Sequence, residues 1–269
     1  MTDLPEFDLL RLERVSTTRF RLPVTTALAT PFGRMYGGIG VAACAEAAEQ
    51  ATGRPLQWIT TQFVGSAVPS ENIDIEVTVP AAGKTTTQSH VTCTIDDRTV
   101  FTSLCAHTSR AGGDRAHFGA MPDVPSPNDC GIDPFEGAPT GSFLDRIERR
   151  LATDDEAGGV GAFADGRVML WCRVRDGAIG SPATQAFVTD IIPLAVCAAL
   201  NVRATGISLD HTVRVIDPEP SEWALIELIP DGFHRSTGHG SLRTWSEDGR
   251  LLGTAQQSSI IRLEPLDSP

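Results

Sequence analysis

The residues best suited to bind a metal or act as nucleophiles are six cysteines and six histidines. The cysteines, at positions 44, 93, 105, 130, 172 and 197, never form a close pair in the sequence, and the histidines show no metal-ligand spacing. Zinc sites and disulfide frameworks are marked by clustered or regularly spaced cysteines. We therefore expect buried free thiols, with Cys44 and Cys197 inside two apolar helices, rather than disulfides or a zinc centre. No metal or organic cofactor is expected.

The sequence supports neither of two common enzyme signatures. The stretch Gly38-Ile39-Gly40-Val41-Ala42-Ala43 matches the glycine fingerprint of dinucleotide-binding folds. That fingerprint requires a buried strand before it and a parallel sheet after it, and neither is predicted here. The Gly-x-Ser-x-Gly elbow of α/β hydrolases does not occur in the chain. The glycines therefore predict the start of a helix rather than a nucleotide site.

Net charge narrows the classes of partner. The chain carries a formal charge of −12, whereas binding to nucleic acid or to an anionic membrane surface requires a basic face. A polyanionic ligand would need local arginine or lysine side chains. The N-terminal residues Met1 to Glu6 are acidic where a signal peptide is basic and then apolar. We expect a cytosolic protein with no nucleic-acid partner and no membrane insertion.

An internal repeat organises the chain. The octapeptide Pro69-Ser70-Glu71-Asn72-Ile73-Asp74-Ile75-Glu76 returns as Pro220-Ser221-Glu222-Trp223-Ala224-Leu225-Ile226-Glu227, with five identities in eight and a spacing of 151 residues. The hairpin signal at 96–98 falls on that at 247–249, at the same spacing. Repeats of this kind fix the architecture before any single element does.

Each half is predicted to contain one strand, one helix rich in small residues and then four more strands. In the first half these elements cover residues 15–22, 38–52, 56–64, 73–79, 85–95 and 100–109. In the second half they cover residues 167–175, 190–203, 207–216, 223–229, 240–245 and 251–263. One helix followed by an antiparallel meander predicts an α+β fold in which a sheet wraps round a central helix, the hotdog arrangement, here doubled. We predict an N-terminal module over 1–110, a linker over 111–150 that a short helix at 143–151 closes, and a C-terminal module over 151–269.

Four segments resemble the type II acyl-CoA thioesterases. They are Phe32-Gly33-Arg34-Met35-Tyr36-Gly37-Gly38, Val188-Thr189-Asp190, Ser208-Leu209-Asp210-His211-Thr212-Val213, and Asp248 to Gln257. The resemblance spans nearly the whole chain in the right order. It implies a tandem double hotdog that hydrolyses acyl-CoA to a free acid and coenzyme A. The dehydrating hotdog enzymes would carry a histidine five residues after the aspartate, where this chain has Ala195.

The resemblance also implies three catalytic residues. An aspartate, a hydroxyl residue and a glutamine hold the attacking water in that family, and the matching positions are Asp190, Ser208 and Gln256. The carboxylate can accept a proton while the other two groups orient the water. The alternatives are that Asp190 caps a helix and that Ser208 faces solvent. Gln257 lies beside Gln256 on the opposite strand face.

The thioester carbonyl needs a donor as it becomes an oxyanion, and Gly37 and Gly38 at a helix N-terminus are our candidates for the oxyanion and substrate-binding site. The alternative is that both glycines only make a tight start to the helix. Subtracting 151 from the three catalytic positions gives Ile39, Gln57 and Cys105, which cannot repeat the chemistry. We therefore expect one site per chain, and we expect His211 to be structural.

Two departures from the family favour a rival function. Family members usually carry an aromatic residue followed by Arg-Pro after the first strand behind the helix, whereas residues 63–69 contain no arginine and residues 214–218 are altered. The rival is a non-catalytic module that binds acyl thioesters. In either case the exposed edges and sheet face of a hotdog predict a homodimer or larger homo-oligomer.

Overall fold

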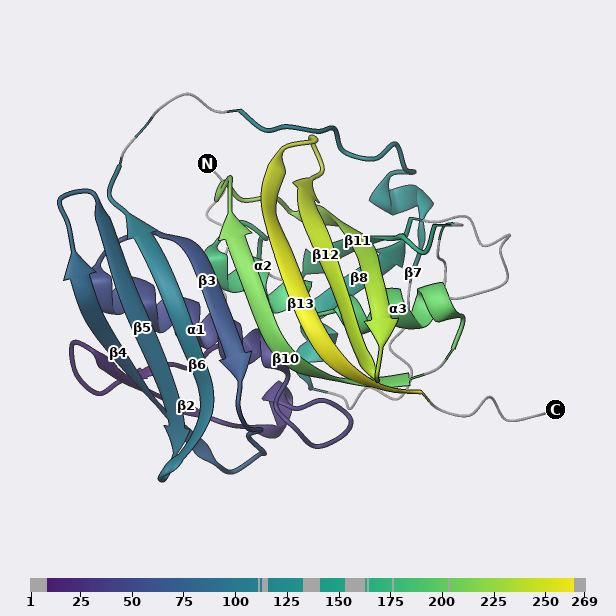
Figure 1. Cartoon of the computed structure of the whole chain (residues 1–269). Helices are drawn as coiled ribbons and strands as arrows, with labels where there is room; N and C mark the ends of the chain where they lie inside the picture. The colour runs from purple at the N-terminus through teal and green to yellow at the C-terminus, as the bar shows by residue number, and fades with distance from the viewer. Residues whose placement is uncertain are drawn as a thin grey trace.

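A computed structural model describes residues 9–110, 112, 116–132, 141–152, 163, 165–175, 177–202 and 204–263. In these residues thirteen strands form one sheet, in the order β1-β2-β4-β5-β6-β3-β10-β13-β12-β11-β9-β8-β7. Figure 1 shows this sheet as one curved layer, with the helices along one of its faces. The first six strands of that order come from the N-terminal half of the chain and the other seven from the C-terminal half. The repeat in the sequence is thus a repeat in the sheet.

The N-terminal half follows the predicted order of elements. It contains β1 (Glu13–Arg14), β2 (Arg19–Pro23), the 3₁₀ turn η1 (Thr26–Leu28), α1 (Gly37–Thr52), β3 (Leu56–Phe63), β4 (Asn72–Ala82), β5 (Thr86–Ile95) and β6 (Arg98–Thr108). Helix α1 is rich in alanine, the best helix former, and most of its residues are buried. It ends at Gly53, whose φ of 63° is left-handed and suits glycine.

The C-terminal half repeats this plan with additions. It contains η2 (Pro127–Asp129), β7 (Gly131–Ile132), η3 (Phe143–Arg146), β8 (Ile147–Leu151), β9 (Val168–Val174), α2 (Pro182–Thr189), α3 (Ile192–Leu200), β10 (Ala204–Val215), β11 (Trp223–His234), β12 (Thr237–Ser246) and β13 (Leu251–Leu263). Strands β9 to β13 and the two helices correspond to β2 to β6 and α1. The halves join where β3 pairs with β10, and the hydroxyls of Thr60 and Thr212 lie 2.7 Å apart at this junction.

Most of the hydrophobic core lies between the sheet and the helices. A second, smaller cluster lies on the other face of the C-terminal half, because alternate residues of a strand point to opposite faces. It includes Trp171, Trp223 and Trp245, and the linker residues Met121 and Val124 pack against it. The indole N–H of Trp171 donates to the Pro125 carbonyl at 2.9 Å. This part of the predicted linker therefore covers the outer face of the sheet.

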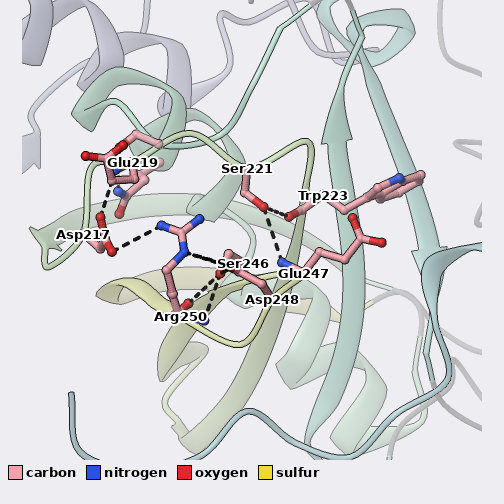
Figure 2. Close-up of polar contacts among 10 residues, drawn as sticks. Asp217, Glu219, Ser221, Trp223, Ser246, Glu247, Asp248 and Arg250 are labelled. Carbon is pink, nitrogen blue, oxygen red and sulfur yellow. Dashed lines mark hydrogen bonds and ion pairs between the residues drawn. The ribbon is translucent and has the colours of Figure 1, made fainter. Parts of the chain in front are cut away.

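The repeated sequence motifs lie at corresponding turns. In the C-terminal half, the Arg250 guanidinium binds Asp217 at 3.2 Å and Asp248 at 3.0 Å, as Figure 2 shows. In the N-terminal half, Arg98 binds the Ser66 carbonyl at 2.8 Å and Glu71 at 3.2 Å. In each half an arginine at or just before the last strand ties the hairpin to the loop that follows the first strand after the helix, β3 or β10. These contacts give the repeat a structural role away from any catalytic site.

The predicted helix over 143–151 is wrong. Residues 143–146 form η3, and the rest forms β8, which pairs with β9. Glu148 is buried in this strand and accepts from Arg150 at 2.7 Å and from Arg173 at 2.5 Å. Ion pairs to two arginines compensate the desolvation of that carboxylate. The run of charges therefore belongs to a strand with satisfied ion pairs, not to a solvated helix.

The cysteines are free thiols in the structure, and Cys44, Cys93, Cys105 and Cys172 are buried. The thiols of Cys44 and Cys93 lie 3.5 Å apart inside the N-terminal core. No group of three or more metal-ligating side chains occurs in the part of the chain that the structure describes. One helical segment, 182–200, is long and apolar enough to cross a membrane, which the sequence prediction did not expect. Most of that segment is buried inside the fold, as a core helix is.

Candidate active site

The helical segment of the C-terminal half is broken at Asp190. Helix α2 ends at Thr189 and α3 begins at Ile192, and Asp190 itself has φ −81° and ψ 59°. Pro193 explains the break, because a proline lacks the N–H that would bond the Thr189 carbonyl and its ring clashes with that carbonyl. The predicted helix over 190–203 is therefore wrong at its start. Asp190 lies between two helices instead of opening one.

The Asp190 carboxylate is held by a hydroxyl and an amide. Its Oδ1 accepts from Ser208 Oγ at 2.9 Å and from Gln257 Nε2. Gln257 Nε2 also reaches Ser208 Oγ at 2.8 Å, while Gln257 Oε1 accepts from the Ile192 N–H at 2.9 Å. Because a backbone N–H is only a donor, it fixes the orientation of the amide and aims the amide NH₂ at the carboxylate. The three kinds of group predicted from the sequence are thus brought together.

Gln256, the predicted amide, does not lie in this cluster. Its side chain is exposed, whereas Gln257 is 2% exposed. Successive side chains of a strand point to opposite faces, and in β13 the odd-numbered residues from Gly253 to Ile261 face the helices. The apolar residues Ala255 and Ile261 lie an even number of positions from 257. Their alternation is the sequence signal that selects Gln257.

Ser208 faces the site and not the solvent. Strand β10 has an irregularity between Ser208 and Asp210 in its pairing with β13, which places both Ser208 and His211 on the helix side. His211 is fully buried, with Nε2 3.1 Å from Thr189 Oγ1. Burial lowers the pKa of His211 to about 3, so its ring is neutral. The ring serves as a packed strand residue beside the site.

The N-terminus of α1 faces the carboxylate from the other half of the chain. A Cβ on Gly37 would collide with Asp190 Oδ2, and one on Gly38 would lie 2.7 Å from the Phe187 carbonyl. The backbone N–H of Gly38 also bonds the Asp190 carboxylate. The two glycines therefore permit the close approach of two helices, and their role as oxyanion donors stays a prediction. Asp190 does not cap α3, because no side chain caps that helix.

The environment of Asp190 changes its titration. Burial raises the pKa of Asp190 to about 7, while the hydrogen bonds from Ser208, Gln257 and the Gly38 N–H act in the opposite direction. A carboxylate with a pKa near neutrality can both take and return a proton at physiological pH. An aspartate of ordinary pKa would be a much weaker base.

A cavity of about 890 Å³ opens beside this cluster. Its wall is largely apolar and comes from both halves, including Tyr36, Phe63, Phe101, Phe143, Val188 and Leu194, with Asp190 and Ser208 among the polar groups. Phe32, which is 73% exposed, and the exposed Arg34 and Arg262 also line the cavity. Because these three side chains reach solvent, they mark the mouth of the cavity. The arrangement suits a ligand with an apolar tail inside and an anionic part outside.

The corresponding positions of the N-terminal half carry no such cluster. Ile39 is fully buried in the core, Gln57 is exposed, and Cys105 is buried as a thiol. The residue that corresponds to Gln257 is Ala106. The polar cluster described here occurs once in the part of the chain that the structure covers.

Comparison with known families identifies the class. The profile of the acyl-CoA thioesterase N-terminal domain matches residues 26–108, and that of the acyl-CoA thioesterase C-terminal domain matches residues 127–261. The chain belongs to the type II acyl-CoA thioesterase family. A comparison with curated protein sequences finds no match.

Solved structures agree on the fold. A protein provisionally described as a thioesterase, from Novosphingobium aromaticivorans DSM 12444, is 29% identical, with a TM-score of 0.84 over 93% of this chain and 98% of that one. A protein with a hot dog fold from Alicyclobacillus acidocaldarius is 21% identical, with a TM-score of 0.81 over 95% and 96%. The acyl-CoA thioesterase II TesB2 of Mycobacterium marinum is 16% identical, with a TM-score of 0.72 over 97% and 98%. The predicted double hotdog is confirmed.

Proposed function

We propose that this protein hydrolyses acyl-CoA to a free acid and coenzyme A through a water molecule held by Asp190, Ser208 and Gln257. The observation that carries the proposal is a buried carboxylate, with a pKa of about 7, fixed by a hydroxyl and an amide on the wall of an apolar cavity. Family membership supports thioester hydrolysis in general. The particular residues and the substrate are our inference.

In this mechanism Asp190 takes a proton from the water as the water oxygen attacks the thioester carbonyl carbon. The carbonyl oxygen becomes an oxyanion near the N-terminus of α1, where Gly37 and Gly38 and the helix dipole favour negative charge. The carbon–sulfur bond then breaks and the thiolate leaves. A thiol has a reference pKa of about 8.5, so its departure needs no strong acid, and Asp190 can return the proton to it.

The mouth of the cavity supports coenzyme A as the leaving group. Within the described residues neither Arg34 nor Arg262 forms an ion pair, although the chain as a whole carries a charge of −12. Guanidinium groups bind phosphates with charge-assisted hydrogen bonds, and an exposed aromatic ring such as Phe32 can stack on adenine. In this proposal Arg34 and Arg262 supply the guanidinium groups that residues 63–69 lack. A cytosolic homodimer or larger homo-oligomer completes the proposal.

The test is thiol release from a series of acyl-CoAs of increasing chain length and from the matching N-acetylcysteamine thioesters, which lack every phosphate. We expect hydrolysis of both series. The double variant Arg34→Ala/Arg262→Ala should raise KM at least several-fold for the acyl-CoAs only. The control Arg11→Ala/Arg110→Ala removes two exposed arginines outside the cavity lining and should change neither series.

Three results would count against the proposal. Binding of acyl-CoA without turnover would favour the rival, a non-catalytic acyl-thioester binding module. Equal changes in KM for both series would show that Arg34 and Arg262 do not bind the phosphates of coenzyme A. A light-scattering mass of 28.7 kDa at micromolar concentrations would refute the oligomer.

A further inference from the structure

We propose that Tyr36, the only tyrosine in the chain, is a positioning residue that aims Asp190 from the other module. The inference rests on the proposed hydrolysis and adds a residue to it. Tyr36 immediately precedes α1 and belongs to the N-terminal half, whereas Asp190 belongs to the C-terminal half. The site would then depend on a contact between the two modules and not on the second module alone.

The Tyr36 hydroxyl bonds the backbone at the helix break. Its single proton is shared between the carbonyl oxygens of Phe187, at 3.1 Å, and of Asp190, at 3.0 Å. The end of a helix leaves carbonyl groups without a partner inside the helix. Leu194 is the residue whose N–H would bond the Asp190 carbonyl in a continuous helix, but it donates to Ile191 instead. Tyr36 therefore supplies a donor that the break removed.

Aromatic contacts hold the Tyr36 ring in place. Phe143 stacks on it, with ring centroids 4.5 Å apart and planes at 5°, and Phe187 meets it edge-on at 5.9 Å. Burial raises the pKa of Tyr36 well above its ordinary value, so the hydroxyl keeps its proton and remains a donor. The ring cannot turn away from the break without losing these contacts.

The same segment also contacts the carboxylate. Gly37 packs against Asp190 Oδ2 and the Gly38 N–H bonds the carboxylate, directly after Tyr36. Residues 36–38 thus fix both the backbone and the side chain of Asp190. Orientation matters because a misplacement of about 1 Å at a reacting group can cost roughly 100-fold in rate. The role of Tyr36 is to keep the carboxylate where Ser208 and Gln257 meet it.

The variant Tyr36→Phe tests this role, because it keeps the ring and removes only the hydroxyl. We expect kcat to fall roughly 10- to 100-fold with KM within about two-fold, since orientation and not binding is lost. The acidic limb of the pH profile of kcat should move to higher pH. Without the hydroxyl, the backbone between α2 and α3 is held less firmly and the Gly38 contact weakens. That contact favours the charged carboxylate, so its weakening raises the pKa of Asp190. The control Ser89→Ala removes a buried hydroxyl that bonds His107 at 2.8 Å in the same module, and should leave kcat and its pH profile unchanged.

Because Tyr36 is the only tyrosine, growth with 3-fluorotyrosine places one ¹⁹F label in the protein. Its resonance should shift with pH with a midpoint near 7, where Asp190 titrates, and Asp190→Asn should abolish that shift. This measurement needs no turnover, so it separates the two proposals. The positioning role is overturned if folded Tyr36→Phe has the kcat and pH profile of the wild type. It is also overturned if Asp190→Asn does not change the pH dependence of the ¹⁹F resonance. Absence of hydrolysis in the wild type overturns the proposed function instead.

Discussion

The helices of the two halves occupy equivalent places but differ in continuity. Helix α1 runs unbroken over 16 residues, whereas its counterpart stops at Thr189 and resumes at Ile192. The position that corresponds to Pro193 is Ala42 in α1. Alanine continues a helix and proline interrupts one. Pro193 thus accounts for the break beside the cavity, whereas α1 continues past Ala42 without one.

The break also explains why the helical segment has partners from two other parts of the chain. Interrupting a buried helix leaves N–H and C=O groups that must be bonded elsewhere. Gln257 in β13 bonds the Ile192 N–H, and Tyr36 bonds the Phe187 and Asp190 carbonyls. Both residues lie next to Asp190, and Gln257 also bonds its carboxylate. In α1 the position equivalent to Asp190 is Ile39, which is fully buried in the core.

The largest expected effect comes from removing the carboxylate. Asp190→Asn should lower kcat by roughly 10²- to 10⁴-fold, the usual range for loss of a general base, with the fold retained. Thiol release measured per folded molecule checks this. Unchanged activity in the variant would rule out Asp190 as the base.

The same variant should gain stability at high pH. The pKa of Asp190 is about 7 in the folded chain and 3.8 as its ordinary value, so ionisation opposes folding. The stability of the wild type is full below pH 4 and falls as pH rises through about 7, by up to about 4 kcal/mol. The asparagine amide of Asp190→Asn does not titrate, so urea unfolding should show the variant more stable above pH 7 and similar near pH 4. A variant less stable than the wild type at every pH would contradict this prediction.

How far the sequence predicts the site depends on which residue is considered. Asp190 and Ser208 stand in segments with family resemblance, and the structure brings them together. Gln256 was predicted instead of Gln257 because the two residues are identical and differ only in the strand face they occupy. A shift of one residue in the alignment exchanges the two faces. The break was missed because the segment before Asp190, which forms α2, was not predicted to be helical, so Asp190 was placed at the start of one helix.

The strands of the two halves were more predictable than the segment between the halves and the contacts between distant residues. The ten strands predicted in the two halves appear near their expected positions. Their order in the sheet differs from the predicted meander, because β3 pairs with β6 and β10 pairs with β13, not with β4 and β11. Strand β8 was missed because its charged residues fit a helix equally well. The buried Glu148 is tolerated in the strand because Arg150 and the distant Arg173 both pair with it. Tyr36 was not predicted as a site residue, since its partners are backbone carbonyls 151 and 154 residues away.

The two neighbouring glutamines offer an intermediate test. Gln257→Ala removes the amide that bonds Asp190 and Ser208, and should lower kcat roughly 10- to 100-fold by misplacing the water. Gln256→Ala changes the same residue type one position earlier, on the exposed face, and should leave kcat within about two-fold. Steady-state kinetics on one acyl-CoA, with melting temperatures in parallel, compares the pair. A larger loss from Gln256→Ala would reverse the register assigned to β13.

The smallest effects are expected in the N-terminal module, and they test whether the modules really differ. Gln57→Ala and Cys105→Ala change the positions that correspond to Ser208 and Gln256 of the other half, but neither side chain lines the cavity. Turnover should stay within a few-fold, because orienting groups matter only where a water is activated. Cys105 is 1% exposed and burial raises its thiol pKa to about 12, so its truncation acts through packing.

That packing loss is expected to be on the order of 1 kcal/mol of unfolding free energy, since the thiol is replaced by a smaller methyl group in a close-packed core. Urea unfolding measures it, and activity per folded molecule separates it from catalysis. Gln57, being exposed, should cost neither stability nor rate. If instead both variants reduced kcat as strongly as Gln257→Ala with folding intact, the first module would contribute side chains to the chemistry. The broken helix would then not be what distinguishes the two halves.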